Sequence, residues 1–214
     1  MLYRIQETKD GILDYFASRI NCIGNVYLIP RILAAQRKAH CFMENRLFQG
    51  EYVRSARILH TPSDFARANL FYLQEIGSLQ ALKPHISRRQ NLTSYLFFYI
   101  ISGSGILNYA DKEYAISEGD CVFIDCRTPY FHQTSDNLWA LNWIHFYGPT
   151  CPAIYLKYVE RGGQPVFRPN TLSSLDGQWN RLYHLASSAD YIKDMRINEH
   201  IFSILTLIME ESWN

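Results

Sequence analysis

The sequence predicts a mostly β fold that ends in helices. Three observations support this prediction: short β-type segments fill residues 71–148, helical periodicity follows, and no low-complexity tract interrupts a composition that is 48% hydrophobic. A chain of 214 residues can bury a sizeable core, so one compact domain with an appendage is expected. Strands at this spacing, separated by Gly, Asp and Pro, are typical of a small barrel or sandwich.

The first part of the chain lacks this rhythm of strands and turns. Residues 1–42 end in a basic patch, and we expect a helical or poorly ordered extension there. Alternatively, Met43 is the natural start and the preceding residues are translated upstream sequence. Residues 43–70 are predicted to form an N-terminal arm ahead of the barrel.

The predicted barrel covers residues 71–148. The aromatic and β-branched run at 95–102 is expected to be a strand covered on both sides. Asp111-Lys112 is a plausible hairpin turn, and Gly119 in the sequence EGD can take a positive φ. Successive side chains of a strand point to opposite faces, so the residues of the last predicted strand fall into two sets. Trp139, Leu141, Trp143 and His145 share one face, and Ala140, Asn142, Ile144 and Phe146 share the other.

Residues 149–214 are predicted to form a connector and a pair of helices. The second helix carries a dense apolar stripe, which needs a partner. One interpretation is that the stripe packs on the barrel of the same chain; the other is that it forms a subunit interface, and both can hold in part. The stripe consists of Ile197, Ile201, Ile204, Leu205 and Ile208.

Composition excludes several classes of function. The chain has 21 basic and 20 acidic residues, a net charge of +1, so broad contact with DNA phosphates is not expected. The five cysteines form no CxxC pair, which indicates reduced thiols in a cytoplasmic protein. We identify no signal peptide and no apolar run long enough to span a bilayer, so no membrane partner is expected.

Four elements in the middle of the chain occur together in a characteristic order. They are the strand before Gly103-Ser-Gly105, the turn at Glu118–Asp120, the segment Ile124–His132 and the strand Trp139–Phe146. With this order and spacing, residues 95–148 resemble the regulatory domain of AraC-family transcriptional regulators. The resemblance extends over about residues 65–212.

The resemblance implies a cupin-like barrel, a double-stranded β-helix that binds a small effector in its interior. It also implies a two-helix element that forms a homodimer, and then a DNA-binding domain with two helix-turn-helix motifs. We find no helix-turn-helix pair in this sequence. DNA contact is therefore expected only through a C-terminal domain that is missing from this chain.

The family's sugar-binding pattern, carried over by position, implies three ligand-binding residues. Arg88 could supply bidentate donors to hydroxyls or a carboxylate. His132 occupies a position that faces the effector, and Trp143 could stack its indole on a sugar ring. Tyr99 and Tyr109 are further candidates for the cavity wall. A sugar-like effector is expected, although the family's effectors are varied.

The metal ligands of cupin enzymes are not found at the corresponding positions. Such a site needs imidazoles and a carboxylate that converge from adjacent strands. The carboxylate position falls on Leu96, the first two histidine positions fall among residues 89–92, and the late histidine falls on Tyr130, with His132 two residues beyond. We therefore expect no metal, no cofactor and no catalytic residues. A free-standing cupin enzyme (a metal-dependent isomerase or dioxygenase) and a dimerisation module without a ligand remain the alternatives.

Overall fold

The computed structural model describes residues 48–49 and 51–211. The expected extension at residues 1–42 lies outside the described residues. Met43, the possible natural start, lies outside them as well. Among the described residues, no helix has the length and apolar character that a bilayer crossing requires.

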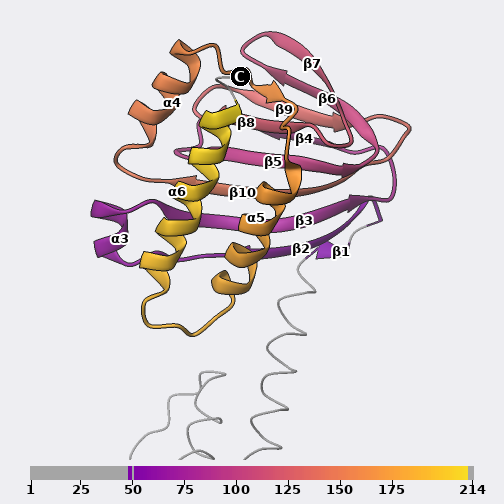
Figure 1. The fold of residues 1–214 in the computed structure, drawn as a ribbon. Coiled ribbons are helices and arrows are strands. Elements are labelled where there is room, and N and C mark those ends of the chain that lie inside the picture. Colours follow the sequence, from indigo (N-terminus) through magenta and orange to yellow (C-terminus); the bar gives the residue numbers. More distant parts are fainter. Residues whose placement is uncertain (1–47, 50, 212–214) are drawn as a thin grey trace, which may run out of the picture. The chain divides into compact units, whose positions relative to one another are not determined.

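The described chain forms two antiparallel sheets and a layer of helices (Figure 1). The larger sheet has the strand order β1-β2-β3-β10-β5-β8-β11, and the smaller has the order β4-β9-β6-β7. The mostly antiparallel β fold with C-terminal helices is as predicted. The strands are β1 (Phe48–Gln49), β2 (Val53–Leu59), β3 (Tyr72–Ala81), β4 (Ile86–Arg89), β5 (Tyr95–Ser102), β6 (Ser104–Tyr109), β7 (Lys112–Ser117), β8 (Cys121–Asp125), β9 (Tyr130–Thr134), β10 (Ala140–Tyr147) and β11 (Val166–Phe167). The helices are α3 (Asp64–Asn69), α4 (Cys151–Glu160), α5 (Leu172–Ala186) and α6 (Lys193–Glu211).

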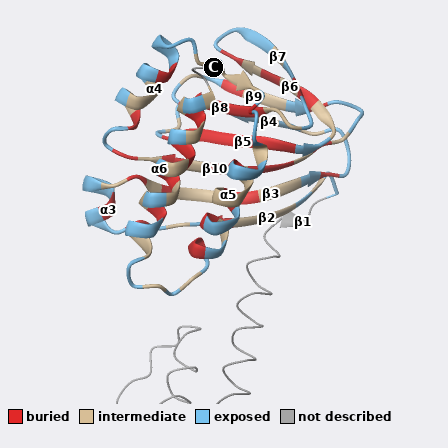
Figure 2. Ribbon diagram, in the orientation of Figure 1, coloured by how far each residue is buried: buried red, intermediate tan, exposed pale blue. Residues whose placement is uncertain are grey.

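Strand β5 is an inner strand of the larger sheet, between β10 and β8. Its first six residues are buried, as expected for a strand covered on both sides (Figure 2). Leu96 and Phe98 face the barrel interior, while Tyr95, Phe97 and Tyr99 belong to the core under the helices. The continuous apolar run therefore reflects two separate cores, one on each side of the sheet.

Two tight turns connect strands of the barrel. Gly119 has a φ of 87°, as predicted, and the turn is closed by the Asp120 carboxylate, which accepts a hydrogen bond from Ser117 N at 2.8 Å. The β6–β7 hairpin turns at Ala110 and Asp111, with φ of 51° and 60°, because Tyr109 and Lys112 already pair across the ladder. The predicted turn at Asp111-Lys112 was therefore one residue too late.

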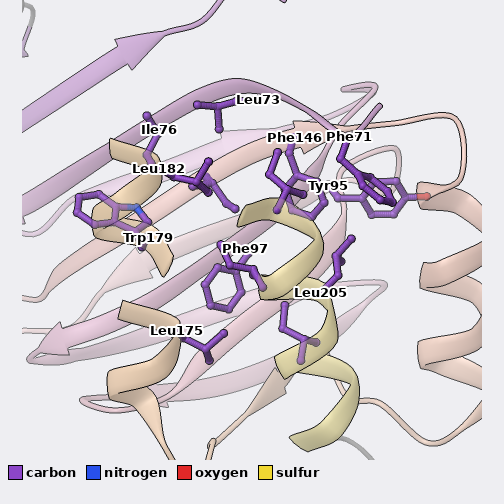
Figure 3. Packing of buried hydrophobic residues seen from close by; sticks show 14 of the residues in the cluster. Phe71, Leu73, Ile76, Tyr95, Phe97, Phe146, Leu175, Trp179, Leu182 and Leu205 are labelled. Carbon is purple, nitrogen blue, oxygen red and sulfur yellow. The ribbon is translucent and has the colours of Figure 1, made fainter. Parts of the chain in front are cut away.

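Helices α5 and α6 cover the outer face of the larger sheet. Figure 3 shows Leu175, Trp179 and Leu182 of α5 and Leu205 of α6 against Leu73, Ile76, Phe97 and Phe146 of the strands. The stripe on α6 is buried in this core. The exposed fractions are 1% for Ile197, 0% for Ile201, Ile204 and Ile208, and 3% for Leu205.

The burial of the stripe corrects its assignment to a dimer interface. These five side chains pack within their own chain, so no surface remains on them for a second subunit. Helical periodicity identifies a face that must be covered, and it cannot show whether the cover belongs to the same chain.

The predicted boundaries also change. Residues 53–59, expected in an arm, form β2, which pairs with β3 along its whole length, so the sheet begins well before residue 71. Residues 149–171 contain α4 and β11, where only a connector was expected. Helix α4 is anchored by Tyr155 and Tyr158, whose rings each lie 5.2 Å from that of Phe123.

Candidate ligand-binding site

A cavity of about 180 Å³ lies between the two sheets. One buried water needs only about 10–15 Å³ by the same kind of measure, so a small organic molecule can be accommodated. Strands β2, β3, β4, β5, β9 and β10 all contribute to the wall. The lining residues are Val53, Ser55, Arg57, Glu75, Leu79, His85, Ser87, Arg89, Leu96, Phe98, Tyr130, His132, Leu141, Trp143 and His145.

Alternation along β10 determines which of its side chains reach this cavity. Leu141, Trp143 and His145 line it, whereas Ile144 and Phe146 pack in the core under the helices. The two faces predicted for this strand are therefore confirmed. For the same reason, every second residue of β2 and of β4 lines the cavity.

His132 lies in the cavity wall, on β9. Its ring centroid is 5.4 Å from that of Phe98 and 5.7 Å from that of Trp139. Burial, aided by the neighbouring His85 and Arg89, lowers the pKa of His132 to about 3. The imidazole is therefore neutral at physiological pH, and its buried Nδ1 has no hydrogen-bond partner.

Trp143 also lies in the wall, and its polar edge is held by the protein. Its Nε1–H donates to Glu75 Oε1 at 2.9 Å, which fixes the indole against β3. The paired residue on β3 is Gly77, where a Cβ would lie 2.5 Å from two ring carbons of Trp143. Trp143 was predicted as a ligand-binding residue, whereas Gly77, which makes room for the indole, was not predicted.

Glu75 and Arg57 form an ion pair in the same wall, and sequence reasoning missed both. Arg57 Nη2 donates to Glu75 Oε2 at 2.6 Å, so both oxygens of this carboxylate have protein partners. The available signal was a glutamate inside the apolar strand 72–81. Arg57 gave no signal because its segment was expected to be an arm outside the barrel.

His145 and His85 are two further imidazoles of the cavity. His145 Nδ1 lies 3.1 Å from Ser94 Oγ. Burial lowers the pKa of His145 to about 4, with Arg89 and Arg57 adding to the effect and Glu75 opposing it. Burial and Arg89 also lower the pKa of His85. These histidines are therefore neutral hydrogen-bonding groups at neutral pH.

The structure places Arg88 outside the cavity. Its guanidinium lies 4.9 Å from the ring centroid of Phe131, on the exposed side of β4. The next residue, Arg89, lines the cavity instead. Because successive side chains of a strand point to opposite faces, an error of one residue in the register exchanges the two arginines.

Tyr99 and Tyr109 do not line the cavity either. The Tyr99 hydroxyl donates to Asp176 Oδ1 at 2.5 Å and accepts from Asn142 Nδ2 at 2.7 Å, so it links the sheet to α5. The Tyr109 hydroxyl lies 3.2 Å from that of Tyr155 on α4. Both tyrosines are buried, and both are occupied by structural hydrogen bonds.

The residues of the cavity do not fit the metal site of cupin enzymes. The positions of the expected carboxylate and the late histidine are part of the wall, but they carry the alkyl group of Leu96 and the phenol of Tyr130. In the described part of the chain, no three or more His, Cys, Asp or Glu side chains are grouped as a metal site requires. The arrangement is instead that of a cavity with aromatic walls and convergent hydrogen-bonding groups, which suits a small ligand.

Comparison with known proteins identifies the family. The model of the AraC-like ligand binding domain matches residues 74–205, from β3 to α6. No curated protein matches the chain. The solved structure of the AraC-like transcriptional activator CuxR is 11% identical, with a TM-score of 0.43, and the match covers 75% of this chain and 62% of that one.

Two other solved structures represent the cupin fold and an enzyme. A cupin 2 conserved barrel domain protein from Leptotrichia buccalis is 22% identical, with a TM-score of 0.35 and coverage of 48% of this chain and 47% of that one. Ectoine synthase from P. lautus is 12% identical, with a TM-score of 0.37 and coverage of 56% and 78%. The family match alone spans more than half of the sequence. The chain belongs to the family of AraC-like ligand-binding domains.

Proposed function

We propose that this chain is the effector-binding and dimerisation domain of an AraC-type transcription regulator. The observation that carries the proposal is the cavity between the two sheets, into which polar groups from five strands converge. A regulator of this kind acts in the cytoplasm, in keeping with the free, buried thiols of Cys121, Cys126 and Cys151.

The effector that suits this cavity is sugar-like. Trp143 offers an indole surface for the apolar face of a sugar ring. The hydroxyls of Ser55 and Ser87 and the imidazole of His132 offer hydrogen bonds to sugar hydroxyls around it. An apolar wall with a few placed polar groups gives both binding and orientation.

A chain of contacts leads from the cavity to the C-terminal helix. Strand β2 lines the cavity and continues to α3, whose N-cap residue Ser63 donates its hydroxyl to Asp194 of α6. Phe71 N also donates to Asn198 Oδ1 of α6, at 2.9 Å. A ligand that shifts β2 would change these contacts, to the extent that it binds the two states differently. DNA contact is assigned to helix-turn-helix motifs outside residues 48–211.

Homodimerisation is part of this proposal, through the face of α6 that points away from the sheet. Met195 and Phe202 on that face are 52% and 54% exposed. Sedimentation of the full chain tests it: the wild type is expected to dimerise, and Met195→Asp is expected to weaken the dimer without unfolding the protein. A wild-type chain that stays monomeric over the whole concentration range would contradict the dimer.

The proposal assigns no catalytic role to the cavity. The wild-type protein, purified without added chelator, is expected to contain iron, manganese and zinc far below one ion per chain. Leu96 and Tyr130 occupy two of the ligand positions, and the described His and Glu side chains of the cavity are not grouped as a metal site requires. Stoichiometric metal that is lost in His132→Ala would instead support the metal-dependent cupin enzyme.

A thermal-shift screen of sugars, sugar acids and aromatic acids tests the central proposal. At least one compound is expected to raise the melting temperature of the wild type, and the rise should disappear in Trp143→Ala. Tyr191→Ala is the control, because that aromatic side chain is 96% exposed and lies outside the cavity. Absence of stabilisation across the whole screen would favour a dimerisation module without a ligand.

A further inference from the structure

The charges in the cavity wall do not balance. Among the residues that the structure describes, two guanidinium groups, those of Arg57 and Arg89, line the cavity together with one carboxylate, that of Glu75. Glu75 is already used by the protein, since its two oxygens accept from Arg57 and from Trp143 Nε1. Two cations against one anion leave one net positive charge, and it resides at Arg89.

Arg89 retains most of its hydrogen-bonding capacity. Among the described residues, no carboxylate forms an ion pair with it, and its one hydrogen bond is a long contact of 3.4 Å from Nη1 to the Arg88 carbonyl oxygen. A guanidinium has five N–H donors in a planar fork that matches a carboxylate. Arg88, one residue earlier, has the same chemistry, but its side chain stacks on Phe131 outside the cavity.

The positive charge of Arg89 acts on the other polar groups of the cavity. Arg89 lines the same cavity as the imidazoles of His85, His132 and His145, and its charge helps to lower the pKa of all three. The neutral rings supply no compensating charge. Arg89 lines the cavity while remaining exposed to solvent, and an anion bound beside it would restore the balance of charge in the wall.

The hydrogen bonds that the imidazoles can offer point to the same kind of ligand. The buried Nδ1 atoms of His85 and His132 have no hydrogen-bond partner. A buried N–H without an acceptor is rarer than a buried acceptor without a donor, which favours the tautomer with the proton on Nε2. That leaves an Nε2–H on each ring as a donor. Together with the guanidinium of Arg89, these rings offer N–H donors to the acceptor oxygens of a ligand.

From these observations we infer that the effector is a sugar acid, whose carboxylate pairs with Arg89 and whose hydroxylated part lies along Trp143. The inference rests on the proposed effector-binding function and specifies its ligand class. A neutral sugar would leave the guanidinium of Arg89 without a counterion. A carboxylate would supply the two acceptor oxygens that its fork can bind.

Matched pairs of ligands test the charge directly. Calorimetric titration of the full chain would compare D-glucuronate with D-glucose, D-galacturonate with D-galactose, and D-gluconate with D-glucitol. In at least one pair, the acid is expected to bind more tightly than its neutral partner by about tenfold or more, the ratio that corresponds to about 1.4 kcal/mol.

Substitutions at two neighbouring positions test whether Arg89 causes the preference for the acid. Arg89→Gln is expected to remove the preference for the acid, because the amide keeps some hydrogen-bonding capacity but no charge. Arg88→Gln removes the same charge one residue away, on the opposite face of β4, and is expected to leave the preference unchanged. The melting temperature of each unliganded variant shows whether it is folded.

The outcomes separate this inference from the proposed function. If the neutral partners bind as tightly as the acids, or if Arg89→Gln keeps the preference, the carboxylate inference fails while effector binding stands. If no pair binds but the broader screen finds another ligand, the sugar-acid class is wrong. If that screen also finds nothing, the proposed function fails as well.

Discussion

Gly77 on β3 lies directly across the ladder from Trp143 on β10, and the indole occupies the space that a side chain at Gly77 would need. A Cβ there would lie 2.5 Å from two ring carbons and 2.5 Å from the carbonyl oxygen of Ala56 on β2. Glu75, two residues earlier on β3, accepts the hydrogen bond of the same indole at 2.9 Å. Strand β3 therefore sets both the position and the orientation of the aromatic wall.

Gly77→Ala is expected to displace Trp143 and to weaken effector binding. Overpacking of this kind lowers the free energy of unfolding by about 1–3 kcal/mol. Urea unfolding would measure the loss of stability, and the tryptophan emission of the folded variant would report the movement of the indole.

Gly177→Ala is the matched control, because a Cβ at this position of α5 meets no atom within 4 Å. It is expected to leave stability unchanged or to raise it by up to about 1 kcal/mol, since alanine is the better helix former. If Gly77→Ala were as stable as Gly177→Ala and kept the wild-type emission, the close contact with Trp143 would be refuted.

Tyr99→Phe is expected to destabilise the protein without affecting the cavity. The lost hydroxyl leaves the buried Asn142 amide without its acceptor and Asp176 Oδ1 without its donor. The free energy of unfolding should fall by about 1–3 kcal/mol, the cost of an unsatisfied buried group. Tyr191→Phe, at a side chain that is 96% exposed, should change nothing. A weaker effector affinity in folded Tyr99→Phe would show that Tyr99 contributes to the binding site.

Ile204→Ala tests the role of the apolar stripe on α6. Because Ile204 is fully buried against the sheet of its own chain, the substitution should cost about 2–5 kcal/mol in a urea titration. The mass of the folded particle, measured by light scattering, should not change. Thr206→Ala, an exposed position on the same helix, is the control. If Ile204→Ala were as stable as the wild type and its particle had half the mass, the stripe would be a dimer interface.

The sequence could predict the features that depend on local periodicity. The doubly covered strand β5, the two faces of β10 and the positive φ of Gly119 all follow from the alternation of side chains and from glycine in a tight turn. His132 and Trp143 were also placed on the inner wall. Each of these features is determined within one strand or one turn.

The features that were missed depend on contacts between distant segments. The choice between Arg88 and Arg89 depends on the pairing of β4 with β9, where Arg89 lies opposite Tyr130 and Arg88 opposite Phe131. Glu75 carried the signal of a carboxylate inside an apolar strand, but its partner Arg57 lies on β2, a strand that was not expected. The partner of the α6 stripe likewise could not be deduced from the stripe, because an apolar face has the same pattern whatever covers it.

The two most buried histidines of the cavity should make stability depend on pH. Burial lowers the pKa of His132 to about 3 and of His145 to about 4, from an ordinary value of 6.5. Above that ordinary value both rings are neutral in the folded and the unfolded chain. As the pH falls from 6.5 towards 4, the unfolded chain binds protons that the folded chain does not, so the folded state loses stability.

Each of these histidines contributes at most about 1.4 kcal/mol per pH unit to this loss. His132→Gln removes one of the two groups, so its free energy of unfolding should fall less steeply than that of the wild type between about pH 6.5 and about pH 4.5. Urea titrations across this range would measure the two slopes, and carboxylates that titrate in both proteins cancel in the comparison. Equal slopes would mean that His132 is protonated in the folded protein as readily as in the unfolded one. The imidazole would then be open to water rather than held neutral in the wall.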